Sequence, residues 1–284
     1  VRAPSPALRP FVRTLWASEP GAPRDRGSAL VARREAILPS GTMHLVFRVA
    51  GPPLWIFTGD DPHGQRFEPA IIGGARSAPY VKDVTEPAES VGAELTPGAA
   101  EVLLGVPAGE LSERHTALSA VLGPAAIIAT QRLVEARSAA ARLDLLEAFL
   151  HARLPRQPSL HPTVAAALTW FAQSADVGEA VRRSGFSHRH FVALFRASVG
   201  LTPKLYCRVR RFQRVIDGAG AGRVDWADLA LAAGYADQPH LHRDFRAFVG
   251  LSPERYRALA APGSRHVPLP GQIFPRPDAR EATR

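Results

Sequence analysis

Two stretches near the C-terminal end decide the fold: Phe191–Tyr206, which reads FVALFRASVGLTPKLY, and Leu241–Tyr256, which reads LHRDFRAFVGLSPERY. At a shift of 50 residues eight positions are identical, including the pair Phe195 and Phe245. Two copies are too few for a solenoid, which needs at least about three repeats to bury a continuous core. The repeat therefore indicates a duplicated functional module.

Each copy has the pattern of a helix, a tight turn and a second helix. Asp176 with Glu179 forms a capping box at the start of the first copy. The first copy is expected to contain a helix over Val177–Ser184, a stop at Gly185, a cap at Ser187 and a helix ending near Val199. The second is expected to contain a cap at Asp225, a helix through Ala232, a stop at Gly234, a cap at Asp237 and a helix over Gln238–Val249. The two copies thus predict the same supersecondary unit.

Further helices flank the two units. Thr202 followed by Pro203 is typical of a helix N-terminus, and it predicts a helix over Pro203–Asp217 that joins the units. A leading helix is expected over Pro162–Gln173. Its apolar residues recur at helical spacing and should face inward: Val164, Leu168 and Phe171.

Two short helices joined by a glycine turn form the helix-turn-helix motif, whose second helix enters the DNA major groove. The candidate DNA contacts in the first unit are Ser187, Arg189, Val192, Ala193 and Arg196. In the second unit they are Gln238, His240, His242, Arg243 and Arg246. Arginine pairs with guanine and glutamine with adenine, whereas valine and alanine offer only apolar contacts. We therefore expect the second unit to read more sequence by hydrogen bonding; the alternative is that these residues are solvated surface.

The charge distribution indicates the same kind of partner. The chain carries 35 Lys and Arg against 26 Asp and Glu, and residues 158–262 hold 14 against 8 of them. A localised basic excess is the electrostatic footprint of a protein that binds a polyanion. The expected partner is double-stranded DNA, bound in its major groove.

The second unit, DLALAAGYADQPHLHRDFRAFVGLSPERYR from Asp228 to Arg257, resembles the signature of the AraC family of bacterial transcription regulators. The resemblance covers about a third of the chain. It implies seven helices, two helix-turn-helix subdomains and a rigid linker helix at Pro203–Asp217. It also implies base contacts in both units, from Arg189, Val192, Ala193 and Arg196 in the first and from Gln238, His240, His242 and Arg243 in the second. Pro239 is a departure, because many relatives have a polar residue there and proline donates no hydrogen bond.

The N-terminal region has another pattern. Short strands separated by Gly, Pro and Asp turns are expected at Met43–Val49, Leu54–Thr58, Ala70–Gly73 and Val91–Leu95. From Ala99 the pattern becomes helical and ends with Leu143–Leu154. We predict an α+β domain, a small β-barrel or sandwich followed by helices, and an all-α C-terminal domain. The first resembles the N-terminal halves of some AraC-type regulators, which are often cupin-like and bind an effector or dimerise.

The predicted boundaries are 1–156 for an effector-binding or dimerisation domain and 157–261 for the DNA-binding domain. Residues 262–284 are predicted to be a proline-rich tail, either disordered or lying over a domain. No stretch approaches about 18 consecutive apolar residues, and no signal-peptide pattern is seen. A cytoplasmic protein without membrane contact is expected.

Signs of an enzyme are lacking in the sequence. There is no glycine-rich phosphate loop, no G-x-S-x-G elbow and no H-E-x-x-H motif. His44 and His63 are isolated, and the pairs His188/His190 and His240/His242 have a spacing that places their side chains on different helix sides. Nothing in the sequence places Glu89, Glu94 and Glu101 together. We therefore expect no catalytic residue, no metal and no cofactor.

Cys207, the one cysteine, excludes an internal disulfide. A redox or alkyl-acceptor role is one interpretation, but a buried apolar role in the linker helix is favoured.

The sequence predicts an AraC-type transcription regulator, modulated by a ligand or a partner through its N-terminal domain. A small-molecule effector, a second copy of the chain and RNA polymerase are the candidate partners besides DNA. Two alternatives remain: an enzyme tethered to the DNA-binding domain, or an N-terminal domain that serves only to dimerise.

Overall fold

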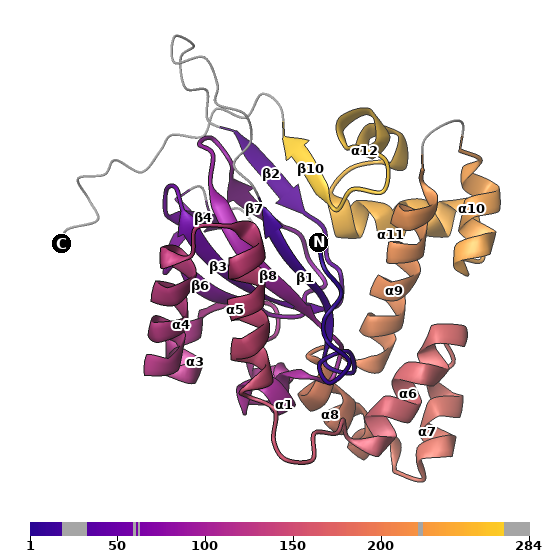
Figure 1. The fold of residues 1–284 in the computed structure, drawn as a ribbon. Helices are drawn as coiled ribbons and strands as arrows, with labels where there is room; N and C mark the ends of the chain where they lie inside the picture. The colour runs from indigo at the N-terminus through magenta and orange to yellow at the C-terminus, as the bar shows by residue number, and fades with distance from the viewer. Residues whose placement is uncertain (19–32, 59–60, 62, 221–223, 270–284) are drawn as a thin grey trace.

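A computed structural model describes residues 1–18, 33–58, 61, 63–220 and 224–269. Two five-stranded antiparallel sheets occupy the N-terminal part, and helices fill the C-terminal part (Figure 1). The first sheet has the order β1-β8-β3-β6-β9, and the second has the order β10-β2-β7-β4-β5. The strands are β1 Val12–Ser18, β2 Arg34–Ile37, β3 Met43–Ala50, β4 Leu54–Phe57, β5 Gln65–Phe67, β6 Ala70–Gly73, β7 Tyr80–Asp83, β8 Glu89–Leu95, β9 His115–Ala117 and β10 His266–Leu269.

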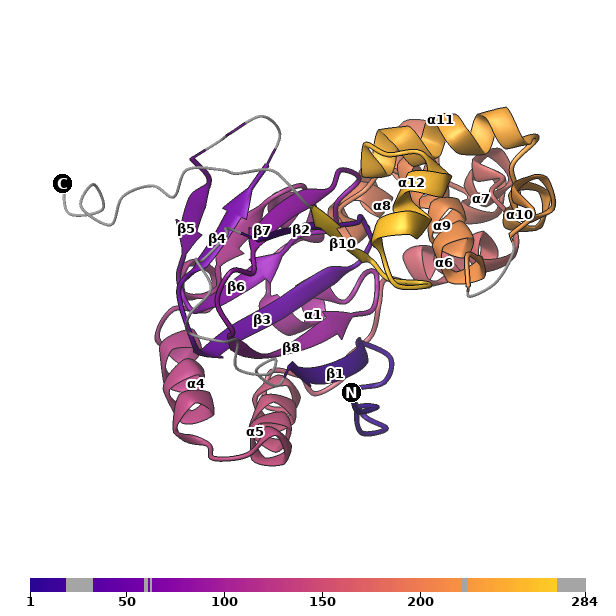
Figure 2. The ribbon, with the colours of Figure 1, turned by 90° about the horizontal axis from the view of Figure 1, so that it is seen from above.

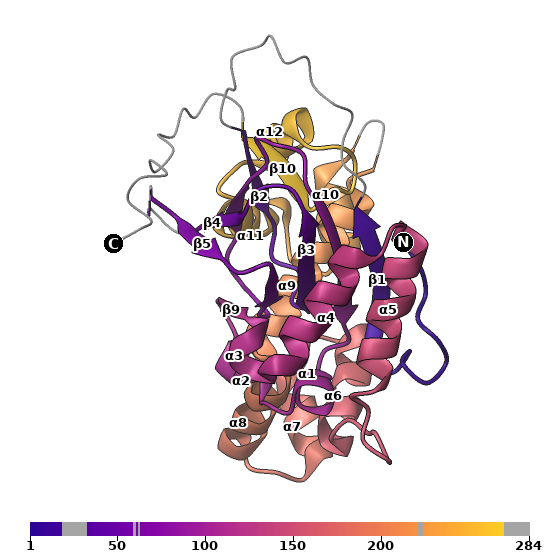
Figure 3. The same ribbon diagram turned by 60° about the vertical axis from the view of Figure 1, so that its left-hand side comes forward.

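Five helices follow or interrupt the strands of the N-terminal part within the described residues: α1 Ala100–Leu104, α2 Ala108–Leu111, α3 Leu118–Leu122, α4 Pro124–Glu135 and α5 Ala139–His151. Helices α3, α4 and α5 cover one face of the first sheet (Figure 3). Side chains along each strand point alternately to the two faces of the sheet. Leu45 and Phe47 of β3 point to the face under the helices and are fully buried. The opposite face meets the second sheet through a small cluster around Leu54, Ile56 and Ile71.

The expected order of strands followed by helices is confirmed. Of the two expected forms, a small β-barrel or a sandwich, the closed barrel is wrong. In the described part of the chain the two sheets face each other but do not close on one another, because β9 and β5 both end as unpaired edges. The expected cupin-like character is not confirmed. Each of these two edge strands has only three residues.

The C-terminal part has seven helices among the described residues, the number that the resemblance implies. They are α6 Pro162–Gln173, α7 Val177–Ser184, α8 His188–Val199, α9 Pro203–Gly218, α10 Trp226–Ala233, α11 Gln238–Val249 and α12 Pro253–Leu259. Seen from above, they form a group beside the sheets (Figure 2). The residues between α5 and α6, 152–161, form neither helix nor strand.

One continuous apolar core joins the two parts. The side-chain Nε2 of Gln213, in the middle of α9, donates to the carbonyl of Pro39 at 2.5 Å. The end of α8 packs on α2, where a Cβ added to Gly109 would lie 3.1 Å from the carbonyl oxygen of Arg196. The helical part is therefore docked on the sheets at both its linker helix and its first unit.

The segment 263–269, which we call the strap, runs from the last helix to the second sheet (Figure 1). Its strand β10 pairs antiparallel with β2, and Val267 is fully buried. Tyr256 of α12 donates its hydroxyl to the carbonyl of Ser264 at 2.7 Å. The start of the expected tail is thus an edge strand, where a proline such as Pro268 is tolerated because one side of the strand needs no partner. Residues 270–284 of that tail lie outside the described residues.

An acidic side chain beside the strap gives the stability of the fold a pH dependence. His266 lies 3.1 Å from Glu35, and Lys82 lies 3.4 Å away. The hydrogen bond from His266, with the charge of Lys82, lowers the pKa of Glu35 to about 2. A carboxyl whose pKa is lowered on folding stabilises the protein above its unfolded pKa, and that contribution is lost as the pH falls.

We expect the wild-type protein to lose stability between a pH of about 4.5 and about 2 more steeply than Glu35→Gln, which has no proton to gain. Urea unfolding midpoints measured across that range test this. Parallel curves for the two proteins would show that Glu35 is not the group responsible.

Candidate nucleic-acid interface

Local hydrogen bonds hold each pair of short helices as the sequence predicts. The side chains of Asp176, Ser187, Asp225 and Asp237 accept backbone N–H groups at the four helix starts. The glycines after these helices, Gly185, Gly200, Gly234 and Gly250, all have a positive φ that closes the helix end. The turn between the helices of each unit is therefore fixed by the sequence itself.

The first reading helix, α8, presents one open face. Arg189, Val192, Ala193 and Arg196 recur at the spacing of a single helix side, and all except the half-buried Val192 are exposed. Ser187 is exposed and caps the helix, accepting the backbone N–H of His190 at 3.3 Å. Among the described residues, neither arginine has an ion pair or a side-chain hydrogen bond. Both guanidinium groups are therefore available to another molecule.

The opposite side of α8 is buried. Phe191 and Phe195 are fully buried, and Phe195 packs against Phe171 of α6 at 5.5 Å between ring centroids. The C-terminal end of the helix lies against α2. The N-terminal half of α8 is consequently the part that can approach a DNA groove.

The second reading helix, α11, places its candidates unequally. His242, Arg243 and Arg246 share one side of the helix, and the two arginines are exposed with no partner in the described part of the chain. Gln238 Nε2 lies 3.4 Å from His242 Nε2, so these two side chains support each other on the first turns. The ring of His240 instead packs edge-on against Tyr235 at 5.1 Å, which turns it toward the preceding glycine turn.

A buried carboxylate anchors the inner side of α11. Asp244 is 4% exposed, and it accepts from Arg208 Nε at 2.7 Å. Arg211 lies 3.6 Å from its other oxygen and stacks on the ring of Tyr235. Burial, with the nearby charge of Asp244, raises the pKa of the Tyr235 hydroxyl. These ion pairs fix the second reading helix to α9. The sequence did not indicate this role for Asp244, because the candidate residues were those expected to face outward.

Comparison with protein families identifies this architecture. Residues 180–259 match the family described as helix-turn-helix domain, and residues 1–117 match a family described as a domain of unknown function (DUF6597). The chain carries an AraC-type DNA-binding domain. Such domains bind DNA and regulate transcription.

Solved structures with a similar overall fold include two of ToxT from Vibrio cholerae. The first is 8% identical, spans 86% of this chain and 98% of that one, and has a TM-score of 0.46. The second, bound to an unsaturated fatty acid, is 9% identical over 82% and 96% of the two chains, with a TM-score of 0.42. The DNA-binding domain of AdpA in complex with a target DNA is 24% identical over 34% and 92%, with a TM-score of 0.32. No curated protein sequence matches the chain.

The three glutamates considered outside the AraC-type domain have different surroundings. Glu89 pairs with Arg142, and Glu94 pairs with Arg13 at 3.2 Å. Glu101 is exposed on α1. Across the described ranges, no group of three His, Cys, Asp or Glu side chains could hold a metal ion.

Cys207 lies buried in α9 of the AraC-type domain, as the apolar interpretation predicts. Burial raises the pKa of its thiol to about 11, so the reactive thiolate is scarce at neutral pH. Helices long and apolar enough to cross a membrane are not found among the residues that the structure describes.

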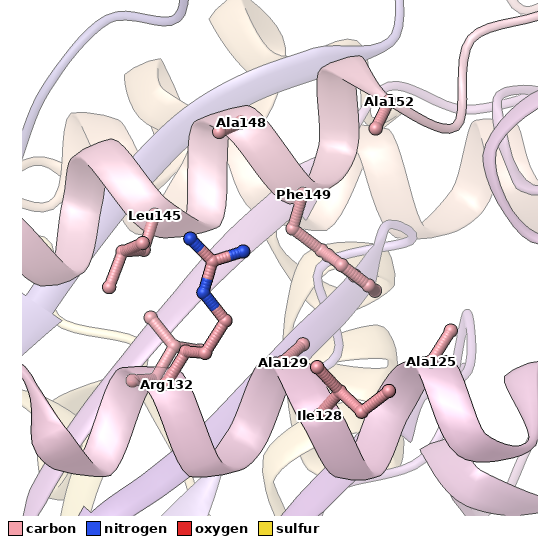
Figure 4. Close-up of a pocket in the computed structure, with 9 residues that line it drawn as sticks. Ala125, Ile128, Ala129, Arg132, Leu145, Ala148, Phe149 and Ala152 are labelled. Atoms are coloured by element: carbon pink, nitrogen blue, oxygen red, sulfur yellow. The ribbon is translucent and has the colours of Figure 1, made fainter.

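A groove between α4 and α5 is an apolar surface that the sequence analysis missed. It encloses about 310 Å³, and Ile128, Arg132, Leu145 and Phe149 line it with four alanines and Leu133 (Figure 4). Ile127, Ile128 and Val134 of α4 are all about half exposed. The signal in the sequence was the pair Ile127-Ile128, which places an apolar side chain outside the inward stripe of the helix.

Proposed function

We propose that the protein is a sequence-specific regulator with a DNA-reading domain at 157–261 and a modulating domain at 1–156. The outward face of each reading helix carries unpartnered arginines while its inward face is anchored, and this observation supports the proposal most strongly. The proposed contacts are Ser187, Arg189, Val192, Ala193, Arg196, Gln238, His240, His242, Arg243 and Arg246. Because it must reach DNA, we place its action in the cytoplasm.

The packing around the proposed contacts supports different roles for them. His242, Arg243 and Gln238 point away from the core and suit base contacts, with arginine reading guanine and glutamine reading adenine. His240 packs on Tyr235 and suits a contact to the phosphate backbone through its outer edge. Val192 and Ala193 offer apolar contacts. We therefore propose that the second unit contributes more of the sequence discrimination.

A selection experiment tests this function. The full-length protein is incubated with a pool of random DNA duplexes, and the bound duplexes are amplified, sequenced and footprinted. A recurring sequence protected over two neighbouring half-sites is the expected result, and its affinity should fall steeply with salt as phosphate contacts release counterions. Recovery of random sequences, or no recovery, would contradict the proposal.

We propose further that an effector or partner bound by the N-terminal domain shifts how the two reading helices are presented. The support is the docking of α2 on α8 and of Gln213 on Pro39, because each contact ties a DNA-reading element to the sheets. RNA polymerase is a further proposed partner, since it is the enzyme whose activity a transcription regulator changes.

The groove between α4 and α5 supports a second role for the N-terminal domain, pairing with a second copy of the chain. Exposed Ile127, Ile128 and Val134 form an apolar strip, and the alanines of the groove allow close approach of a partner helix. Packing the same strip of two copies together buries it in an isologous interface.

We expect Ile128→Glu to convert a concentration-dependent dimer into a monomer, because two charges would be buried at the shared interface. Sedimentation velocity measures this, with Leu231→Glu as the matched control, since Leu231 is exposed on α10 of the AraC-type domain. A dimer that survives Ile128→Glu would exclude this face.

A further inference from the structure

The two sheets leave an open edge where β5 and β9 lie opposite each other. A hollow of about 440 Å³ opens there. Its lining residues are Gln65, Arg66, Phe67, Glu68, Arg114, His115, Thr116 and Ala117. His115 pairs with Gly73 in the sheet, and both lie on the face that meets the second sheet. The hollow is therefore the mouth of the space between the sheets.

Rings and polar side chains lie at this mouth and next to it. The ring of His115 lies between Tyr80 and Phe67, at 4.5 Å and 5.6 Å between centroids. Arg76 lies 5.3 Å from the Tyr80 ring, and its Nε is buried without a hydrogen bond. Within the described ranges, neither the His115 ring nor the Tyr80 hydroxyl has a hydrogen-bond partner. Of these atoms, Arg76 Nε is the one that is fully buried, and a buried N–H without an acceptor is costly, so it indicates a place for an added acceptor.

The protonation states of these groups favour donation to a ligand. Burial lowers the pKa of His115 to about 3, so its imidazole is neutral at physiological pH. Burial raises the pKa of Tyr80 to about 12, so its hydroxyl keeps its proton. Arg76 donates one N–H to the carbonyl of Glu113 at 2.6 Å and has others to offer. The site thus presents a cation and neutral donors.

The charges around the mouth are unbalanced. Arg66 and Arg114 are exposed lining residues, and Arg76 lies beside the Tyr80 ring. Glu68 accepts from the hydroxyl of Ser119 at 2.6 Å, and Glu113 accepts from Ser77. These two carboxylates keep their charges, so three arginines against two glutamates leave a surplus of one positive charge. An anion is the ligand charge that this surplus favours. The flat rings of Phe67, Tyr80 and His115 favour a planar apolar body attached to that charge.

A direct structural path leads from this mouth to the first reading helix. The residue two before His115 is Glu113, whose φ of 60° is unusual for a side chain other than glycine. Gly74 donates its N–H to the carbonyl of Arg114 at 3.0 Å, and a Cβ on Gly74 would lie 1.7 Å from the carbonyl oxygen of Leu111. The sheet edge therefore touches the end of α2 with no space between them.

The other side of α2 touches α8. A Cβ added to Gly109 would lie 3.1 Å from the carbonyl oxygen of Arg196. A Cβ added to Gly200 would lie equally close to the Cβ of Ala75. A four-residue helix held between two backbones has little freedom to absorb a displacement, because packed interiors transmit strain. A shift of β9 by a ligand would thus reposition α8.

We propose that the open edge between β5 and β9 binds a small aromatic carboxylate, and that α2 passes its occupancy to the first reading helix. Arg76, Tyr80 and His115 contact the carboxylate, and the ring stacks against Phe67. This inference rests on the proposed function, because it supplies the site and the ligand class through which the N-terminal domain modulates DNA binding.

Calorimetry with the full-length protein tests the site, with benzoate as the probe and benzamide as its uncharged counterpart. We expect benzoate to bind at least about 10-fold more tightly than benzamide, and Tyr80→Phe to weaken it by about 5- to 10-fold. Arg114→Ala should weaken benzoate binding, whereas Arg132→Ala, in the separate α4–α5 groove, should not. Equal binding of the two compounds, absence of benzoate binding, or loss on Arg132→Ala would each overturn the site.

The path through α2 is tested with the duplex obtained by selection. Benzoate should change the affinity of the wild-type protein for that duplex by about 5-fold or more. Gly109→Ala should still bind benzoate but lose this change, and Glu110→Ala, an exposed neighbour on α2, should keep it. Retained coupling in Gly109→Ala would refute the path. If the protein selects no DNA, the proposed function fails, while calorimetry still decides the site.

Discussion

Replacing Phe245 with alanine is expected to lower the free energy of unfolding by about 3–5 kcal/mol, the cost of removing a buried aromatic ring. Phe245 is fully buried between rings from three helices: Phe212 of α9 at 5.4 Å, Trp226 of α10 at 6.3 Å and Tyr256 of α12 at 5.4 Å. No neighbour can collapse into the space without leaving its own contacts. Urea unfolding followed by circular dichroism measures the change.

The repeat provides an internal check on this result. Phe195 occupies the same place in the first unit, where Phe171, Phe191 and Tyr206 surround it within about 6 Å. Phe195→Ala should therefore cost a similar amount. Leu231→Ala, at a side chain that is 62% exposed, should change stability by less than about 0.5 kcal/mol. A small effect at Phe245 would show that the second unit contributes little to the common core.

Replacing Arg243 with alanine is expected to remove about 1–3 kcal/mol of binding free energy and to relax the preference for one base pair. The guanidinium is exposed on the open side of α11 and has no partner among the described residues, so the whole side chain is free to pair with guanine. The backbone that carries it is held in place through the adjacent Asp244. Affinities for the selected duplex and its single base-pair variants measure both effects.

Arg137→Ala is the matched control for Arg243→Ala, because it removes one exposed arginine from the N-terminal part. It should leave both affinity and base preference nearly unchanged. If Arg243→Ala weakens binding equally to every duplex and lowers the salt dependence, Arg243 contacts a phosphate rather than a base.

The helix-turn-helix units could be predicted because their determinants are local. A cap such as Ser187 and a stop such as Gly185 act within one helical turn, so the residues that fix each boundary lie beside it in the sequence. The linker helix, expected over Pro203–Asp217, ends one residue later at Gly218. The inward side of α6 followed from spacing alone, and Val164 and Phe171 are buried there.

The arrangement of the sheets could not be predicted, because it depends on pairing between distant segments. The sequence around His115 does not reveal that this residue faces Tyr80 across an open edge. His115 lies in β9, which pairs with β6 in the first sheet, whereas Tyr80 lies in β7 of the second sheet. The strap escaped prediction for a similar reason. Its proline signals an end of regular structure locally, and its partner β2 lies more than 200 residues away.

The site prediction shared this limit. Exposure and spacing identified Arg243 and Arg246, but the side-chain partners of His240 and Asp244 required the packed structure. A side chain at the same position of a reading helix can either face DNA or pack against the neighbouring turn. Only the tertiary contacts show which of the two it does.

The strap gives the chain an order of completion during synthesis. The outer edge of β2 is made more than 200 residues before β10, the strand that covers it. Until the last of the DNA-binding helices and the strap have left the ribosome, that edge exposes a row of backbone N–H and C=O groups on which another unfinished chain could pair. This edge of β2 is therefore covered only when the DNA-reading half has been made, and the edge that replaces it is the short strand β10, which carries Pro268.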